Sequence, residues 1–479
     1  MPAMARTGTA RQAAQAESST VPGCCFRVEA LTFSHKDELV RLGESCQFAG
    51  EFAEGNGLVD IAGHWFCLYH LPFNEADFAA MTQVDVALSG EDKARLKSEW
   101  STDRQEAFNQ AILSDKVAPA RQAQVLCDLT GVVFPGNFVA DGLVFPAVSF
   151  VHARFSGGNA SFDGALFSGG AAWFENAQFS GGDTWFSRAQ FSGGVAVFDG
   201  AQFSGGVASF ENARFAGFAS FTAPRHDARA RQGQDPGDFD FSHVRFRSAS
   251  FEGSVTFENR RFSGRTSFTN ARFAKAPEFH GCALHQDTVF PAMENFGGRE
   301  GEEAARAYRT LKLAMGQHRA TAEEAMFWAL EQITTRSTLK PLQRPRDIMP
   351  WLLSASYEAA SFYGLSVTRP LLLFLVSTLI VFPLYVYQPL HEFAVSGLPS
   401  DGITLREIAD AVSFSMRQVV RPFDIWSRYD LDALKLLDPA ASEQTSYLGT
   451  KLIATGQSVV SLALVTLFLL ALRRRFRMV

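Results

Sequence analysis

The sequence predicts a mainly β fold, a β-solenoid, followed by helices and two transmembrane helices. Phenylalanine recurs at alternating intervals of five and seven residues, and a small residue stands two positions before most of these phenylalanines. The chain has 45 Phe but only 8 Tyr, and two long apolar runs without charge lie near its end. A helix repeats every 3.6 residues and a strand every two, so neither alone explains the phenylalanine pattern.

The first segment, residues 1–22, is polar and lacks the apolar stretch of a secretory signal. We expect a disordered tail, with the following region in a reducing cytoplasm. The net charge of −6 and the pI near 6.0 argue against a nucleic-acid partner. Six cysteines in 479 residues do not form a disulfide framework.

Residues 23–130 contain a candidate metal site. Cys67 and His70 have the Cys-x₂-His spacing of metal ligands, and thiolate together with imidazole suits Zn²⁺. The alternative is a set of buried cysteines, because Cys is among the residue types most often found in protein interiors. The candidate ligands of a Cys₃His structural zinc site are Cys25, Cys46, Cys67 and His70, with Cys24 as the substitute for Cys25.

Residues 131–295 carry the repeat. A phenylalanine and the small residue two positions before it point to the same side, since side chains alternate along a strand. Asp-Gly follows Phe162 and Glu-Asn follows Phe174, and Gly and Asn tolerate the positive φ of tight corners. The longer intervals contain Ser-Gly-Gly, which predicts a wider corner. The predicted core residues are Phe155, Phe162, Phe167, Phe174, Phe179, Phe186, Phe191, Phe198, Phe203 and Phe210.

The 24 repeat centres between positions 145 and 290 predict six coils if each coil has four sides. At about 4.8 Å per coil, the rod would be about 30 Å long, with phenylalanine rings stacked along its axis. A polar loop insert, residues 222–238, interrupts the series.

This pattern resembles the pentapeptide-repeat family, whose unit A-(D/N)-L-x-x has the same small residue two positions before a large central one. The resemblance implies a right-handed, four-sided β-helix, in which the extra residues of this chain would make bulged corners. Family members often begin with a similar Cys…Cys-x₂-His segment. The phrases YRTLK, YGLSVTRP and LALRRRFRM are similar to those of membrane-bound pentapeptide-repeat proteins of bacteria.

Two activities are disfavoured for the solenoid. Some members of the family are thought to imitate DNA through an acidic face, but residues 150–290 contain equal numbers of acidic and basic side chains. No cluster of His, Cys or carboxylate residues recurs along the repeat. We therefore expect a protein that is not an enzyme.

Residues 300–365 are expected to be helical and to end at a membrane interface. Tyr308, Leu311 and Met315 share one helical face with Ala304. Thr321 and Glu324 predict a capping box at the start of a second helix.

Residues 370–388 and 452–472 are the predicted transmembrane helices. The second apolar run has 21 residues, enough to cross about 30 Å of hydrocarbon. The first apolar run, residues 371–387, has 17 residues and contains Pro383, so a buried core helix is its alternative. Gln457 and Ser461, four residues apart, predict a helix–helix contact and a homo-oligomer. The predicted interface anchors are Trp351, Arg369, Arg473, Arg474 and Arg475, the last three in a basic tail, residues 473–479.

These flanking charges predict a multi-pass inner-membrane protein with the N-terminal domains and the C-terminus in the cytoplasm. Residues 389–450 would be an extracytoplasmic loop with an amphipathic helix at 404–420. The predicted function is a membrane-tethered scaffold or sensor whose solenoid binds a protein, with membrane lipid as a further partner. The alternative is an oligomeric two-helix channel gated by the solenoid, although residues 403–448 contain no glycine for a K⁺-type filter.

Overall fold

The computed structural model describes residues 24–26, 46–48, 51, 57–224, 239–381, 409, 412–413 and 447–477. It divides into two compact units, residues 1–274 with 281–291, and residues 275–280 with 292–479. The expected tail 1–22, most of the insert 222–238 and nearly all of the loop 389–450 with its helix 404–420 lie outside the described residues. Predictions about these segments, including the channel, stay predictions.

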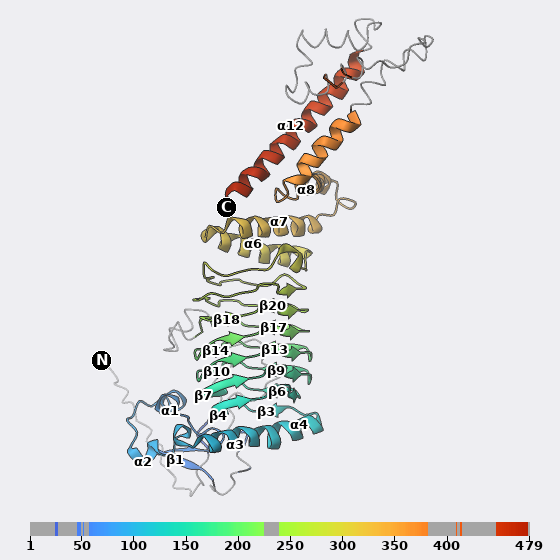
Figure 1. Cartoon of the computed structure of the whole chain (residues 1–479). Coiled ribbons are helices and arrows are strands. Elements are labelled where there is room, and N and C mark those ends of the chain that lie inside the picture. Colours follow the sequence, from blue (N-terminus) through green and yellow to red (C-terminus); the bar gives the residue numbers. More distant parts are fainter. Residues whose placement is uncertain are drawn as a thin grey trace, which may run out of the picture. The chain divides into compact units, whose positions relative to one another are not determined.

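The first unit contains the predicted β-solenoid, built from short parallel strands in three sheets (Figure 1). Two sheets have six strands each, in the orders β21-β19-β16-β12-β8-β5 and β20-β17-β13-β9-β6-β3. The third has the order β14-β10-β7-β11-β15-β18, with β4 also paired to β7. The start of β7 pairs with β10 and its end with β11, so this sheet turns a corner and supplies two of four faces.

The strands of the solenoid are β3 (Cys127–Asp128), β4 (Val133–Val139), β5 (Val144–Phe145), β6 (Val148–Ser149), β7 (Arg154–Ser161), β8 (Leu166–Phe167), β9 (Ala171–Trp173), β10 (Gln178–Phe179), β11 (Thr184–Trp185), β12 (Gln190–Phe191), β13 (Val195–Val197), β14 (Gln202–Phe203), β15 (Ala208–Ser209), β16 (Arg214–Phe215), β17 (Phe218–Ser220), β18 (Val244–Arg245), β19 (Ser250–Phe251), β20 (Val255–Thr256) and β21 (Arg272–Phe273).

Phenylalanine ladders fill the interior. Phe162 stacks on Phe186 with ring centroids 4.7 Å apart and planes 2° apart, and Phe186 stacks on Phe210 at 5.0 Å and 3°. Within one coil the rings meet edge to face, as Phe162 and Phe174 do at 5.8 Å and 88°. The ten predicted core phenylalanines are all buried. The strand spacing of about 4.8 Å thus sets a stacking distance that suits aromatic rings.

The ladder begins earlier than the sequence pattern predicted. Phe134 stacks on Phe155 at 4.7 Å and 6°, and Phe138 contacts Phe155 at 5.3 Å. These two phenylalanines are only four residues apart. Phe138 pairs with Ala160, a small-residue position of the repeat, and the register between β4 and β7 shifts between Gly136 and Phe138. This irregularity hid them from a search for intervals of five and seven residues.

The two kinds of corner use glycine for different reasons. At tight corners Gly164 and Asn176 have φ values of 65° and 54°, as the Asp-Gly and Glu-Asn pairs predicted. At a wide corner, a Cβ atom on Gly193 would lie 2.4 Å from the backbone nitrogen of Gly170 in the neighbouring coil. The Ser-Gly-Gly glycine therefore allows neighbouring coils to stack backbone against backbone.

Helices close the first end of the solenoid. α3 (Thr102–Ile112) packs on β4, and it is followed by η3 (Leu113–Val117) and α4 (Ala118–Ala123) (Figure 1). Asn109 Nδ2 donates to the carbonyls of Pro135 and Asn137, at 2.6 and 2.9 Å. Lys97 Nζ donates to the carbonyl of Val133 at 2.6 Å. These side chains satisfy backbone groups at a strand edge that would otherwise be free to pair with another chain.

The polar insert leaves a break in one ladder. Phe203 and Phe241, on either side of the insert, are 5.9 Å apart with planes at 63°, so they do not stack. Arg260 is 0% exposed and occupies the repeat position that holds a small residue in most coils. Its guanidinium lies 4.6 Å from the centre of the Phe241 ring. It donates to the carbonyls of Phe198, Ala201, Phe221 and Phe239 at 2.5–2.9 Å.

We expect Arg260→Ala to lower the free energy of unfolding by about 3 kcal/mol or more, because several buried carbonyls lose their donors. The neighbouring Arg261 is exposed and forms an ion pair with Asp240 at 3.6 Å. Arg261→Ala should therefore cost less than about 1 kcal/mol. Denaturant unfolding of both variants checks the prediction, and equal losses would contradict it.

A buried carboxyl lies at one tight corner. Glu175 is 2% exposed, and its burial, together with the neighbouring carboxylate of Asp199, raises its pKa from 4.5 to about 7. Folding therefore favours the protonated carboxyl. This contribution to stability is fully present below pH 4.5 and is lost as the pH rises through about 7.

We expect Glu175→Gln to stabilise the fold at about pH 8, by on the order of 2 kcal/mol, and to change little near pH 4.5. The matched control is Glu211→Gln, since Glu211 begins the same Glu-Asn corner pair but is only half-buried. Thermal unfolding at both pH values measures the difference. A gain for Glu175→Gln that is independent of pH would show that titration of this carboxyl is not its cause.

The second unit begins with η4 (Met293–Asn295) and contains the two helices predicted for residues 300–338. These are α6 (Gly301–Gln317) and α7 (Thr321–Thr338). Tyr308 is buried, donates its hydroxyl to the carbonyl of Gly297 at 2.6 Å and packs edge to face on Phe296. The predicted capping box is wrong, because Ala320 is the N-cap residue, Thr321 is the first residue of α7 and no side-chain cap forms.

The unit continues with η5 (Pro345–Asp347), α8 (Ile348–Ser361), an apolar helix at Thr368–Val381 and α12 (Tyr447–Arg477). Among the described residues, one helix is long and apolar enough to cross a membrane, with 22 residues at Leu452–Arg473. The helix at Thr368–Val381 is shorter than a span, and residues 382–388 of the predicted first span lie outside the described residues.

The small and polar residues of α12 are buried within the chain itself. Gln457 and Ser461 are 4% and 1% exposed, and they share a buried face with Ala454 and Ser458. α12 contacts α8 of the same unit. These side chains are thus buried within a single chain, and the predicted homo-oligomer stays a prediction. Of the predicted interface anchors, Trp351, Arg369 and Arg473 are exposed, and the side chains of Arg474 and Arg475 are not described.

Candidate metal centre

A β-hairpin presents the Cys-x₂-His pair. β1 (Val59–Ile61) and β2 (His64–Phe66) are antiparallel and are joined by Ala62 and Gly63, both of which have positive φ. Two left-handed residues in a two-residue loop are typical of a type I′ turn. β2 ends at Phe66, so Cys67 follows the hairpin directly.

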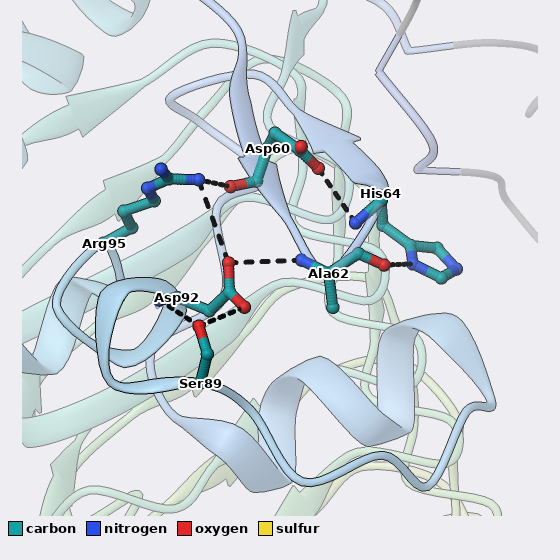
Figure 2. A network of polar contacts seen from close by, with 7 residues as sticks. Asp60, Ala62, His64, Ser89, Asp92 and Arg95 are labelled. Carbon is teal, nitrogen blue, oxygen red and sulfur yellow. Dashed lines mark hydrogen bonds and ion pairs between the residues drawn. The ribbon is translucent and has the colours of Figure 1, made fainter.

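Polar contacts to a neighbouring helix hold the hairpin tip (Figure 2). α1 (Glu75–Thr82) comes after the hairpin in the chain, then α2 (Gly90–Lys93) and η2 (Lys97–Glu99). Arg95 Nη1 donates to the carbonyl of Asp60 at 2.6 Å, and the carboxylate of Asp92 accepts from the backbone of Ala62 at 3.4 Å. Ser89 Oγ donates to Asp92 at 2.7 Å, and this hydrogen bond lowers the pKa of the carboxyl. These contacts fix the hairpin, and the hairpin in turn fixes the position of Cys67, which follows it in the chain.

Four potential ligands from three segments of the chain converge beside the hairpin. Cys46 Sγ lies 3.7 Å from Cys67 Sγ, and the Nδ1 atom of His70 lies 3.2 Å from Cys67 Sγ and 3.6 Å from Cys24 Sγ. All four ligand atoms lie within 4.8 Å of one another. Cys46, Cys67 and His70 are buried, and Cys24 is half-buried.

The surroundings of His70 direct one ring nitrogen toward the sulfur atoms. Nε2 lies 3.1 Å from the carbonyl of Thr130, which requires the proton on Nε2 and leaves Nδ1 as an electron-pair donor. Phe26 stacks on the imidazole at 4.0 Å and 16°. Gln47 Nε2 also donates to the Thr130 carbonyl, at 2.7 Å. Thr130 leads into β4, so these two bonds tie the cysteine segments to the start of the solenoid.

The three thiols share their protons unevenly. Hydrogen bonds from Cys46 and Cys67 lower the pKa of Cys24, whereas the hydrogen bond to Cys24 raises the pKa of Cys46 to about 12. The pKa of Cys67 is raised for the same reason. One negative charge therefore suppresses ionisation of the other two thiols, and a bound divalent cation would relieve that repulsion.

The position of Cys25 corrects the predicted ligand set. Cys25 was the first choice and Cys24 its substitute, but Cys24 is the member of the group. Of the two adjacent cysteines, Cys24 has its sulfur atom beside the other three ligand atoms. Cys25 instead lines a separate cavity of about 340 Å³ with His64, His152 and Arg154.

The donor set fits zinc. Three sulfur atoms and one imidazole nitrogen form a closed Cys₃His set, which is typical of structural rather than catalytic zinc. Ligand atoms around a tetrahedral Zn²⁺ with Zn–S bonds of ~2.3 Å lie about 3.8 Å apart, close to the separations found here. The sequence did not predict that the carbonyl of Thr130 accepts hydrogen bonds from His70 and Gln47, because neither Thr130 nor Gln47 belongs to a ligand motif.

Comparison with models of known protein families found none that matches this chain, and comparison with curated proteins found no match either. The β-solenoid with its stacked phenylalanines is consistent with pentapeptide repeats.

We expect the purified chain to contain about one Zn²⁺, and Cys24→Ser to remove most of it, because the closed ligand set is lost. Cys25→Ser is the matched control, since Cys25 is the adjacent residue and lies outside the group. Elemental analysis of both variants after dialysis measures the difference. Equal zinc contents would contradict the assignment of Cys24.

Proposed function

We propose that this protein is a membrane-tethered scaffold of the pentapeptide-repeat type, without enzymatic activity, whose solenoid binds another protein. The observation that carries the proposal is that each coil has separate inward-facing and outward-facing side chains. Phenylalanine and a small residue fill the core of each coil, and most of the other side chains face outward. A stack of such coils offers long, flat faces on which outward residues recur in register.

The exterior offers features that suit a protein partner. Trp185 is half-exposed on β11, and its strand neighbours on either side are Ser161 and Ser209. On another face Trp173 is itself buried with Val151 and Val197, and only Ala171 and Val195 beside them are partly exposed. Tryptophan within a mostly polar surface is typical of binding hot spots.

The closed Cys₃His group supports a structural role for Zn²⁺ in this proposal. The ion would fasten two cysteine segments to the hairpin, and His70 and Gln47 would fasten that assembly to Thr130. Repeat proteins need capping elements at their ends, and a small cap with few core residues gains from a metal. The zinc would thus stabilise the first end of the scaffold.

α12 supports the membrane tether. Its apolar stretch at Leu452–Arg473 is long enough to cross a bilayer, and most of its apolar part is not buried within the chain. A core helix of a soluble protein would be mostly buried. With the predicted first span, both ends would lie in the cytoplasm of an inner-membrane protein, and the solenoid would meet a cytoplasmic partner there.

We expect a photo-crosslinking residue at Gln190, which is exposed on β12, to capture a discrete protein partner in cells that produce the full chain. Glu91, exposed on α2 outside the repeat, is the control position and should give no such product. Mass spectrometry of the adduct identifies the partner. If Gln190, Val195 and Arg214, which lie on different strands of the solenoid, all give none, the scaffold proposal is wrong.

A further inference from the structure

A run of large apolar side chains is exposed where α8 begins. Five of the first six residues of α8 are large and apolar, and the sixth is Pro350. Met349 and Leu353 are 63% and 62% exposed, and Leu342 shortly before them is fully exposed. We call this set, Leu342 with residues 348–353, the α8 apolar segment; its other large members are Ile348, Trp351 and Leu352.

The rest of α8 is held firmly, so this exposure is not a sign of a loose helix. Glu358 forms an ion pair with Arg336 of α7. Tyr357 packs edge to face on Trp328 at 6.0 Å. The second half of α8 is therefore fixed to α7. The first half leaves Met349 and Leu353 largely exposed, whereas Trp351 is 37% exposed and lines a cavity with Ile333 and Arg336 of α7. A contiguous apolar surface of this kind is typical of a binding site.

Basic side chains lie among the apolar ones. Lys340, Arg344 and Arg346 are exposed, and Asp347 is the one carboxylate between residues 340 and 353. A net positive segment disfavours a second copy of itself as the occupant, because like charges repel. Apolar residues, an interfacial tryptophan and basic residues together are the composition of segments that lie in an anionic bilayer surface.

We propose that the α8 apolar segment docks into the headgroup region of an anionic phospholipid bilayer, with Trp351 at the depth of the glycerol backbone and Arg344 and Arg346 at lipid phosphates. The proposal rests on the proposed membrane tether, and α8 contacts α12, the candidate span. The bilayer would then hold the chain at two places. The second contact would fix the orientation of α6 and α7 against the membrane.

The test uses the full chain in vesicles of phosphatidylcholine and phosphatidylglycerol, with bromine on the acyl chains either near the glycerol or near the bilayer centre. Bromine quenches tryptophan emission only at short range, and the difference between wild type and Trp351→Phe isolates the emission of Trp351. We expect bromine near the glycerol to remove most of this emission and bromine near the centre to remove less. Trp328→Phe is the control, because Trp328 is half-buried against Tyr357 and Tyr363.

The charge contribution is tested by Arg346→Glu, which should weaken the quenching of Trp351 in vesicles that contain phosphatidylglycerol. Arg306→Glu makes the same charge change at an exposed position of α6 and should leave the quenching unchanged. If the chain floats with vesicles but Trp351 is not quenched, another occupant covers the segment and the proposal is overturned while the tether stands. If the chain does not float with vesicles, the tether is wrong and this proposal fails with it.

Discussion

The stacking of phenylalanine rings at the spacing of β-strands is the interaction on which the rest of the solenoid depends. Neighbouring strands lie about 4.8 Å apart, and offset stacked rings also prefer centroid distances from about 4.5 Å. The rings of Phe167 and Phe191, for example, are 4.6 Å apart with planes 2° apart. Backbone hydrogen bonding and ring stacking therefore favour the same repeat. Because the coils are held at this spacing, the corners of neighbouring coils lie in close contact. A glycine such as Gly193 is found where the backbones of two coils meet, since a side chain would not fit there.

A stack of coils must also be ended and, in this chain, interrupted. At the first end, Lys97 and Asn109 supply donors to carbonyls of β4, and the Cys₃His group is tied to Thr130 just before it. At the insert, Arg260 supplies the donors that a regular coil would have provided. Both solutions place long polar side chains where the repeat fails, because backbone groups out of reach of water still need partners. In the first unit, long polar side chains that hydrogen-bond the backbone are therefore found where the repeat ends or is interrupted.

The second unit differs from the solenoid in its surface. The solenoid exposes mostly polar side chains, whereas α8 and α12 expose large apolar ones. α12 exposes Leu452 and Leu469, and α8 exposes Met349 and Leu353. Water does not favour such surfaces, and a bilayer provides an apolar surrounding that removes them from it. The polar scaffold and the apolar helices thus suit two different surroundings within one chain.

The sequence by itself determined the solenoid, because a phenylalanine with a small residue two positions before it defines both the strand and its inward face at most repeats. It also determined the corner chemistry, α6 and α7, and the Cys-x₂-His pair, since each depends on residues close together in the chain. Only the tertiary structure decided that Cys24 rather than Cys25 joins the group, that Arg260 is buried, and that Gln457 and Ser461 face their own chain. Those outcomes depend on which distant segment arrives beside a residue, and neither spacing nor composition encodes that.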